Sequence, residues 1–176
     1  MRNRVLILAA VALAPFTAAS SQELAAPSNV FSIQPLNAMF TAYSAEYERK
    51  IGAAATIGVG GTYFNIGDGV DEVSFKSGDV KLRYYPNGSA LMGFSFGGTA
   101  GFTSVTGTDF NGAEESVSGP TIGILLEYQW LLGVQKNFSV ALGAGAKAVF
   151  VKDNTITSND FTTRYPTVRV SVGYAF

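Results

Sequence analysis

The C-terminal segment TRYPTVRVSVGYAF, from Thr163 to Phe176, narrows the possible folds of this chain more than any other stretch. From position 167 onward, apolar side chains alternate with small or polar ones, and the polar face carries Arg169. Side chains of a β-strand point to opposite faces with a period of two, so the pattern predicts a strand with one wholly apolar face. A soluble sandwich would turn this face to a core, whereas a transmembrane barrel would turn it outward to lipid.

The N-terminus has the pattern of a secretory signal peptide. Two arginines in MRNR precede an apolar run from Val5 to Leu13, and small residues follow. We expect cleavage between Ala19 and Gln22, which assigns 1–21 to the signal peptide, 22–28 to a short lead-in and 29–176 to one barrel domain. The chain has no Cys, so an exported fold would be held by backbone pairing and packing alone.

The composition favours a membrane protein that crosses with strands. The chain is 47% hydrophobic but only 14% charged, below the roughly 25% that is usual for soluble domains. Beyond the N-terminus, no apolar run approaches the ~18 residues of a membrane-spanning helix. Its 176 residues are enough for one domain.

Segments of alternating polarity, each bounded by turn residues, recur along the mature chain. The connections after the second, fourth and sixth segments are short, and those after the third, fifth and seventh are longer. Transmembrane barrels have short periplasmic turns and longer external loops in this way, although the first external connection here is short. The sequence therefore predicts an all-β, eight-stranded antiparallel up-and-down transmembrane β-barrel. The expected strands are 29–35, 41–50, 54–63, 74–85, 91–105, 119–131, 138–150 and 163–176.

Charged side chains fall on the face that a transmembrane barrel turns inward. An eight-stranded barrel has an interior just wide enough for side chains to fill, and charges buried there need partners. We therefore predict a salt-bridge network that plugs the lumen, with a narrow or gated pore as the alternative. Its members are four acids and four bases: Glu46, Glu48, Asp79, Lys81, Arg83, Glu127, Lys147 and Arg169.

Aromatic side chains recur on the outward face at the ends of the even-numbered strands. In an up-and-down barrel those ends share one rim, so the pattern predicts an interfacial aromatic girdle. Its members are Tyr47, Tyr84, Tyr128 and Trp130, joined by Tyr174 and Phe176. The candidates for a second girdle at the opposite rim are Tyr63, Phe75, Phe102 and Phe150.

With this alternation and its aromatic end, Tyr174-Ala175-Phe176, the chain from about 29 to 176 resembles the small eight-stranded bacterial outer-membrane barrels of the OmpA and OmpX type. In that family the terminal pattern is the signal read by the outer-membrane assembly machinery. The resemblance assigns this role to Val168, Val170, Val172, Tyr174 and Phe176.

The resemblance also implies a location and a set of partners. It places the protein in the outer membrane of a Gram-negative bacterium, in contact with outer-membrane lipid and lipopolysaccharide, after delivery by periplasmic chaperones. The sequence ends at Phe176, so we expect no periplasmic peptidoglycan-binding domain of the kind that larger members carry. Pro166 lacks a backbone donor, and we expect it at a rim or a bulge.

Residues that could carry chemistry are scarce. The chain has no His and no Cys, so it lacks the His base of acyl-hydrolysing outer-membrane barrels and any His or Cys metal ligand. The glycine-rich stretches 58–61 and 143–145 lie inside expected strands and are not phosphate loops. No basic patch suggests a nucleic-acid partner. We therefore expect no enzymatic activity and no cofactor.

The expected external loops are acidic. Their carboxylates could be solvated loop tips, or they could form a surface for a divalent cation such as Ca²⁺ or for a cationic ligand. The residues concerned are Asp68, Asp71, Glu72, Asp109, Glu114, Glu115, Asp153 and Asp160.

These expectations favour an integral outer-membrane protein with a structural or surface-interaction role and a charge-plugged lumen. A narrow channel for small solutes or ions is the first alternative. A soluble, lipocalin-like barrel with an apolar ligand is the second. The inward charges contradict it: Glu46, Lys81, Arg83 and Glu127.

Overall fold

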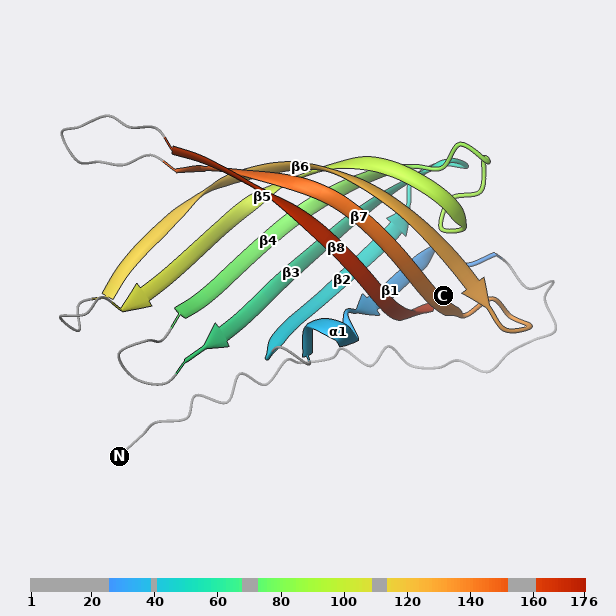
Figure 1. The fold of residues 1–176 in the computed structure, drawn as a ribbon. Coiled ribbons are helices and arrows are strands. Elements are labelled where there is room, and N and C mark those ends of the chain that lie inside the picture. The colour runs from blue at the N-terminus through green and yellow to red at the C-terminus, as the bar shows by residue number, and fades with distance from the viewer. Residues whose placement is uncertain (1–25, 39–40, 68–72, 109–113, 152–160) are drawn as a thin grey trace.

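The computed structural model describes residues 26–38, 41–67, 73–108, 114–151 and 161–176. The expected signal peptide, 1–21, lies outside the described residues. In the described part the chain forms eight antiparallel strands that pair in sequence order and close into one barrel, as the sequence predicted (Figure 1). The strands are β1 (Asn29–Ile33), β2 (Ala42–Lys50), β3 (Ala55–Ile66), β4 (Val73–Tyr84), β5 (Gly93–Thr108), β6 (Glu114–Leu132), β7 (Phe138–Val151) and β8 (Phe161–Ala175).

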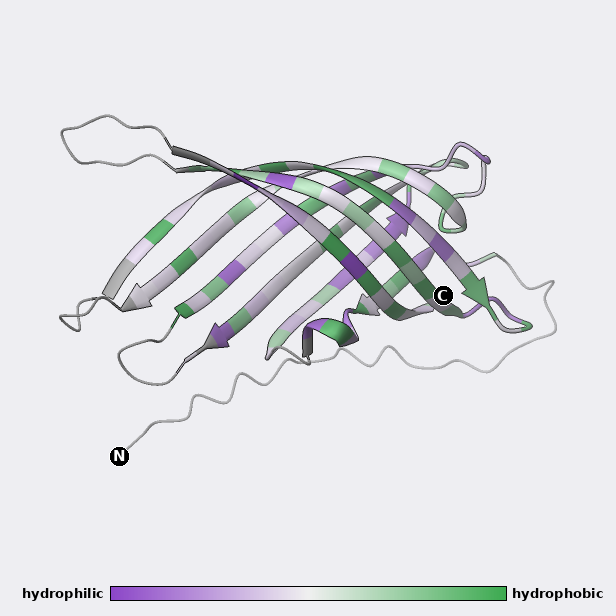
Figure 2. Ribbon diagram, in the orientation of Figure 1, coloured by the Kyte–Doolittle hydropathy of each residue, from purple (hydrophilic) through white to green (hydrophobic). Residues whose placement is uncertain are grey.

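The two faces of the barrel wall follow the alternation in the sequence. Along β4, Val80, Leu82 and Tyr84 are exposed on the outer face. On the opposite face of the same strand, Asp79 and Arg83 are buried in the lumen, and bands of opposite hydropathy alternate along the strands in Figure 2. Because the outer face is apolar and the inner face polar, the polarity of this barrel is the reverse of that of a soluble protein.

The strands at the rim away from the C-terminus are longer than the sequence suggested. β3 continues to Ile66, β5 continues to Thr108, and β6 begins at Glu114. The long loops expected at 64–73 and 106–116 are therefore partly strand. The pairing of β5 with β6 runs through Ser104 and Ser118 to the last residues of the hairpin, because a ladder continues wherever the register keeps both backbones in line.

The wall is least regular between β8 and β2. β1 is two residues shorter than the strand expected at 29–35, and it pairs with β8 only over Val30–Ile33. The following residues form a short helix, α1 (Pro35–Ala38), where the sequence suggested a plain connection. α1 contacts both β2 and β8 (Figure 1). Among the described residues, no helix is long and apolar enough to cross a membrane.

The connection between β4 and β5 differs from the tight turn expected at Pro86-Asn87-Gly88. It runs from Tyr85 to Met92, and Tyr85, Ala90 and Leu91 are buried. Its backbone is tied to the neighbouring connection, since Tyr85 N donates to Ala54 O at 2.8 Å and Ala90 N donates to Ala53 O at 2.8 Å. The segment carries three apolar or aromatic side chains, and their transfer from water into the end of the barrel is favourable. The segment therefore folds inward.

Several glycines are required where neighbouring strands approach closely. A Cβ on Gly97, which faces the lumen from β5, would overlap the backbone carbonyl of Leu82 on β4. The next residue, Gly98, faces outward, and a Cβ there would meet only Gly123 O at 3.8 Å. A Cβ is therefore tolerated at Gly98 but not at Gly97, because Gly97 lies on the inner side of the curved wall and Gly98 lies on its open outer side.

This difference predicts the effect of two matched substitutions. Gly97→Ala should lower the free energy of unfolding by about 1–3 kcal/mol, the usual cost of overpacking. Gly98→Ala should leave it within about 0.5 kcal/mol. Urea unfolding of the detergent-refolded protein, followed by Trp130 fluorescence, measures both. Equal effects of the two variants would contradict the steric argument.

Candidate functional site

The polar lumen is the candidate functional site. All eight charged residues predicted to face inward do so in the structure, and all eight form ion pairs with one another. They come from five strands, β2, β4, β6, β7 and β8, that are far apart in the sequence. The four acids and four bases balance in formal charge.

Glu46 on β2 is the centre of the network. Its carboxylate accepts from Arg83 Nη2 at 2.7 Å and from Arg169 Nη1 at 2.5 Å, and it also contacts Lys81 Nζ. The side chain is 2% exposed. Three cations on one buried carboxylate hold β2, β4 and β8 together across the lumen, because charge-assisted hydrogen bonds are stronger than neutral ones.

Arg83 on β4 joins this centre to two further acids. Its guanidinium lies 3.3 Å from Glu48 Oε1 and 3.4 Å from Glu127 Oε1. Arg169 Nε reaches the other oxygen of Glu127 at 3.3 Å. Arg83 Nε and Nη1 and Glu127 Oε1 make no hydrogen bond, so these longer contacts are electrostatic only. The planar fork of Arg suits a position between several carboxylates.

Asp79 forms a second cluster nearer the other rim. It contacts Lys147 of β7 and lies 3.5 Å from Lys81 Nζ, and Thr99 Oγ1 donates to it at 3.2 Å. Lys81 therefore links this cluster to Glu46. A cavity of about 330 Å³ lies beside the charges, lined by Asp79, Lys81, Lys147 and Arg169 among others.

Below the charges, at the rim where β4 ends, Tyr85 fills the lumen. Its hydroxyl lies 3.0 Å from Glu48 Oε1 and 2.9 Å from Gln129 Oε1. Thr56 donates to the same Glu48 oxygen, and Gln129 Nε2 donates to Ser139 Oγ at 3.1 Å. Tyr85 is fully buried, and so is Leu91, which packs against Val30 and Ala175 of the terminal strands.

Tyr85 is a lumen residue for which the sequence predicted no role. The sequence does indicate that Tyr85 faces the lumen, because it continues the inward series of Asp79, Lys81 and Arg83 at every second position. Leu91 begins the expected strand 91–105 and shares its inward parity with Gly93 and Ser95, but that parity did not indicate that it would pack against Val30 and Ala175.

Burial raises the pKa of the Tyr85 hydroxyl well above its ordinary value of 10.0, and the neighbouring Glu48 carboxylate adds to the rise. The hydroxyl therefore remains protonated at neutral pH and can donate to Glu48.

The predicted aromatic girdle lies on the outer face. Tyr47, Tyr84, Tyr128 and Trp130 are all exposed. Tyr128 stacks at a tilt on Trp130 with ring centroids 4.6 Å apart, and Tyr84 meets Phe96 edge to face at 5.5 Å. The residues of the expected assembly signal face the same way: Val168, Tyr174 and Phe176 are exposed, and Val170 and Val172 are half-buried.

One residue expected in the girdle of the opposite rim is not there. Phe75 shares its face of β4 with the inward Asp79, and it stacks on Phe64 of β3 with ring centroids 4.7 Å apart. The prediction was wrong because the period of two, counted from Asp79, places position 75 inside. Tyr63, Phe102 and Phe150 are exposed on the outer face as expected.

The expected acidic loop surface cannot be placed in the barrel. Asp68, Asp71, Glu72, Asp109, Asp153 and Asp160 lie outside the described residues, as do the side chains of Glu114 and Glu115. Within the described part of the chain, no group of three acidic side chains could hold a metal ion.

Solved structures that resemble this barrel include those of Ail and of a domain of OprF. Ail, the attachment invasion locus protein of Yersinia pestis, matches with a TM-score of 0.53 and 14% sequence identity, over 86% of this chain and 99% of that chain. The N-terminal β-barrel domain of Pseudomonas aeruginosa OprF matches with a TM-score of 0.49 and 14% identity, over 86% and 98%. No protein-family model and no curated protein matches the chain.

The fold is that of the small eight-stranded outer-membrane barrels. In such a barrel the lumen is the only space that the eight strands enclose, so its filling decides whether anything can pass. Here the charged cluster and Tyr85 lie at successive levels of that space.

The buried hydroxyl of Tyr85 yields a stability prediction with a built-in control. Tyr85→Phe should lower the free energy of unfolding by about 1–3 kcal/mol, because Glu48 and Gln129 lose a buried partner. The adjacent Tyr84 faces outward, and Tyr84→Phe should change it by less than about 0.5 kcal/mol. Urea unfolding at pH 7 measures both, and a Tyr85→Phe protein as stable as wild type would contradict the proposed role of the hydroxyl.

The raised pKa of Tyr85 also predicts a pH dependence. Below pH 10 the hydroxyl is protonated in both states and its contribution is complete. Above pH 10 the unfolded state loses the proton while the folded state keeps it, so stability falls with rising pH. The advantage of wild type over Tyr85→Phe should shrink above pH 10 by up to about 1.4 kcal/mol per pH unit. A constant difference between pH 8 and 11 would contradict it.

Proposed function

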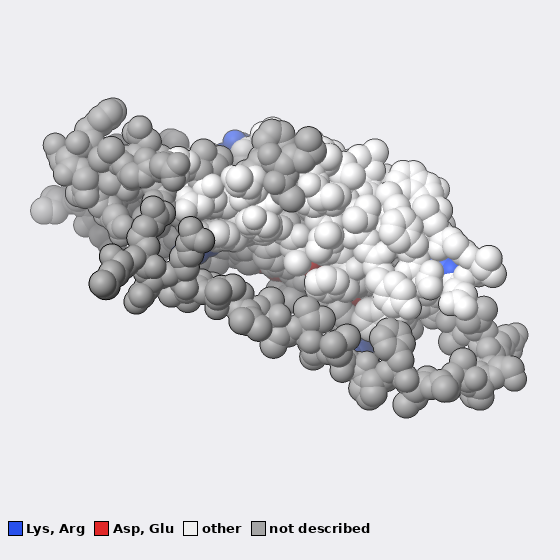
Figure 3. All heavy atoms as spheres, turned by 90° about the horizontal axis from the view of Figure 1, so that it is seen from below, with Lys and Arg blue, Asp and Glu red and all other residues white. Residues whose placement is uncertain are grey.

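We propose that the protein is an integral outer-membrane β-barrel with a structural or surface-interaction role, whose lumen is closed by its own side chains. The observation that carries this proposal is the outer wall. On its described strands, the charged side chains are Arg49, Lys76 and Arg164, and each lies within four residues of a strand end. In Figure 3 the described surface is mostly white, and the red acidic atoms are set back in a hollow.

Lipid explains this wall better than water does. A Lys or Arg at the middle of a bilayer costs roughly 2–4 kcal/mol, and the cost falls to nearly nothing at the interfaces. Exposed Leu, Ile, Phe and Val side chains fill the middle of the wall instead, such as Ile124 at 70% exposed. In water, a continuous apolar surface of this kind would drive aggregation.

The polar ends of β5 and β6 support an orientation. Their outward residues beyond the apolar belt are Ser104, Thr106, Ser116 and Ser118. In barrels of this kind the longer extensions face the cell exterior and the short turns face the periplasm. The rim with the C-terminus would then be periplasmic, together with the girdle of Tyr47, Tyr84, Tyr128 and Trp130.

A closed lumen favours a structural role over transport. The ion pairs around Glu46 fill one level, and Tyr85 with Leu91 fills the next. Every neutralised pair removes a charge that could draw an ion through. The lumen contains neither a His base nor a thiol, so no constellation for acyl transfer is available there.

The first test is conductance in a planar bilayer. The refolded protein should insert and remain silent, because the lumen is filled. Stable single-channel steps would favour the narrow channel. A chain that stays soluble and monomeric without detergent would overturn the membrane proposal and favour the lipocalin-like alternative.

Removing two acids should open or weaken the plug. The double variant Glu46→Ala with Glu127→Ala leaves two carboxylates against four cations in the lumen, so conductance should appear or the thermal midpoint should fall. Breaking a buried ion pair typically costs about 3–5 kcal/mol. Arg49→Gln, at the rim on the outer face, is the control and should change neither quantity. If the double variant is as silent and as stable as wild type, the ion pairs do not hold the lumen closed.

A further inference from the structure

A groove of about 690 Å³ lies on the outer wall, in the half of the barrel away from the C-terminal rim. Its floor crosses neighbouring strands on one row of the sheet, where Ala45 of β2 pairs with Gly61 of β3, and Gly61 pairs with Gly78 of β4. The row is bounded by Ile33 of β1 at one end and Phe102 of β5 at the other. Tyr43, Tyr63 and Phe102 line the groove with exposed side chains of the outer wall, which places its mouth on the outside, and the inward Ser44, Thr62 and Ser77 also contribute to its lining.

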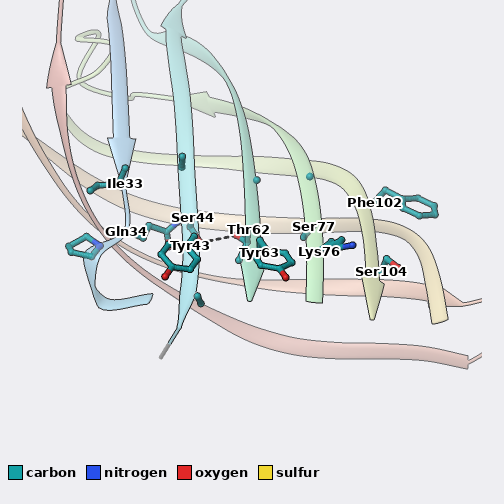
Figure 4. A pocket seen from close by; sticks show the side chains of 15 residues that line it. Ile33, Gln34, Tyr43, Ser44, Thr62, Tyr63, Lys76, Ser77, Phe102 and Ser104 are labelled. Atoms are coloured by element: carbon teal, nitrogen blue, oxygen red, sulfur yellow. Dashed lines mark hydrogen bonds between the residues drawn. The ribbon is translucent and has the colours of Figure 1, made fainter. Parts of the chain in front are cut away.

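One edge of the groove is polar and aromatic. The row next to the floor, on the side of the external rim, pairs Tyr43 with Tyr63, Tyr63 with Lys76, and Lys76 with Ser104. Figure 4 shows the two tyrosines side by side, with Lys76 and then Phe102 further along. A furrow with an apolar floor therefore ends at two hydroxyphenyl rings and one ammonium group.

The barrel does not need glycine at the floor for its own packing. A Cβ on Gly61 would meet Ser77 O at 3.4 Å, and a Cβ on Gly78 would meet Gly60 O at 4.0 Å; both are ordinary contacts. Neither residue has a positive φ. This contrasts with Gly97 and Gly101 in the lumen, where a Cβ would overlap backbone. A Cβ would fit at Gly61 and at Gly78, so the barrel's own packing does not require glycine there, and the space that glycine leaves is open to a molecule from outside.

Lys76 offers a positive charge to a molecule bound in the groove. It is exposed, and among the described residues it forms no ion pair. It is the fourth residue of β4, at the level where the apolar belt meets the polar ends of β5 and β6. An ammonium group at a membrane interface suits a phosphate, while tyrosine and serine hydroxyls suit sugar hydroxyls.

We propose that this groove binds the phosphorylated, acylated glycolipid of the outer leaflet, lipopolysaccharide. One acyl chain lies in the furrow over Ala45, Gly61 and Gly78, and a phosphate pairs with Lys76. This inference rests on the proposed function, since only a barrel in the outer membrane, oriented with this rim outward, presents the groove to that lipid.

The test measures lipid retained by the purified, refolded full-length mature chain. The protein is inserted in nanodiscs that contain lipopolysaccharide and phosphatidylethanolamine, extracted in mild detergent, and examined by native mass spectrometry. Gly61→Leu fills the furrow and Lys76→Gln removes the charge. Their controls are Gly98→Leu, an outward glycine outside the groove, and Arg164→Gln, an outward cation of β8 outside the groove.

Wild type and both controls should retain lipopolysaccharide, and each groove variant should retain about tenfold less. Lys76→Gln loses the charge-assisted contact with the phosphate, and Gly61→Leu occupies the space of the acyl chain. Equal retention by all five proteins overturns the proposal, and so does a loss confined to phosphatidylethanolamine. Lys76→Gln leaves the packing of the wall unchanged, so the test survives if Gly61→Leu does not fold.

The two proposals fail in different ways. If wild type does not enter the nanodisc, as judged by protection from trypsin, the outer-membrane proposal fails, whatever lipid is bound. If wild type inserts and is protected but holds no lipopolysaccharide, only the groove proposal fails.

Discussion

The contact of one buried carboxylate, that of Glu46, with three cations is the interaction on which the interior of this barrel depends. The apolar wall faces outward, so the strands must direct their polar side chains into a space too small for bulk water. Charge placed there without a partner would be prohibitive. Arg83, Lys81 and Arg169 converge on Glu46 from two other strands, and the pairs with Glu48, Asp79 and Glu127 follow from that arrangement.

This requirement also constrains the wall itself. Arg83 Nη1 lies 3.2 Å from where a Cβ on Gly58 would stand, so a small residue beside the network makes room for the guanidinium. Elsewhere the curvature of a narrow barrel brings neighbouring backbones together, as at Gly97. The glycines of the lumen are thus fixed by packing, whereas those of the outer groove are not. That contrast separates a structural glycine from one that leaves space for a ligand.

The lumen is filled differently toward the two rims of the barrel. At the C-terminal rim, a connecting segment folds under the strands and places Tyr85 and Leu91 inside. Toward the other rim, Phe64 and Phe75 stack above a cavity of about 330 Å³. The lumen therefore contains a polar cavity toward that rim and is filled by side chains at the C-terminal rim.

The sequence by itself determined the number of strands, the face on which each side chain lies, and therefore the membership of the charged lumen. It could do so because alternation is a local consequence of strand geometry. Tertiary structure alone decided which acid meets which base, how far β5 and β6 continue, and that the segment from Tyr85 to Leu91 turns inward. It also decided that Ala45, Gly61 and Gly78 form one row. These features depend on the register between strands and on barrel closure, which bring together residues that no local pattern relates.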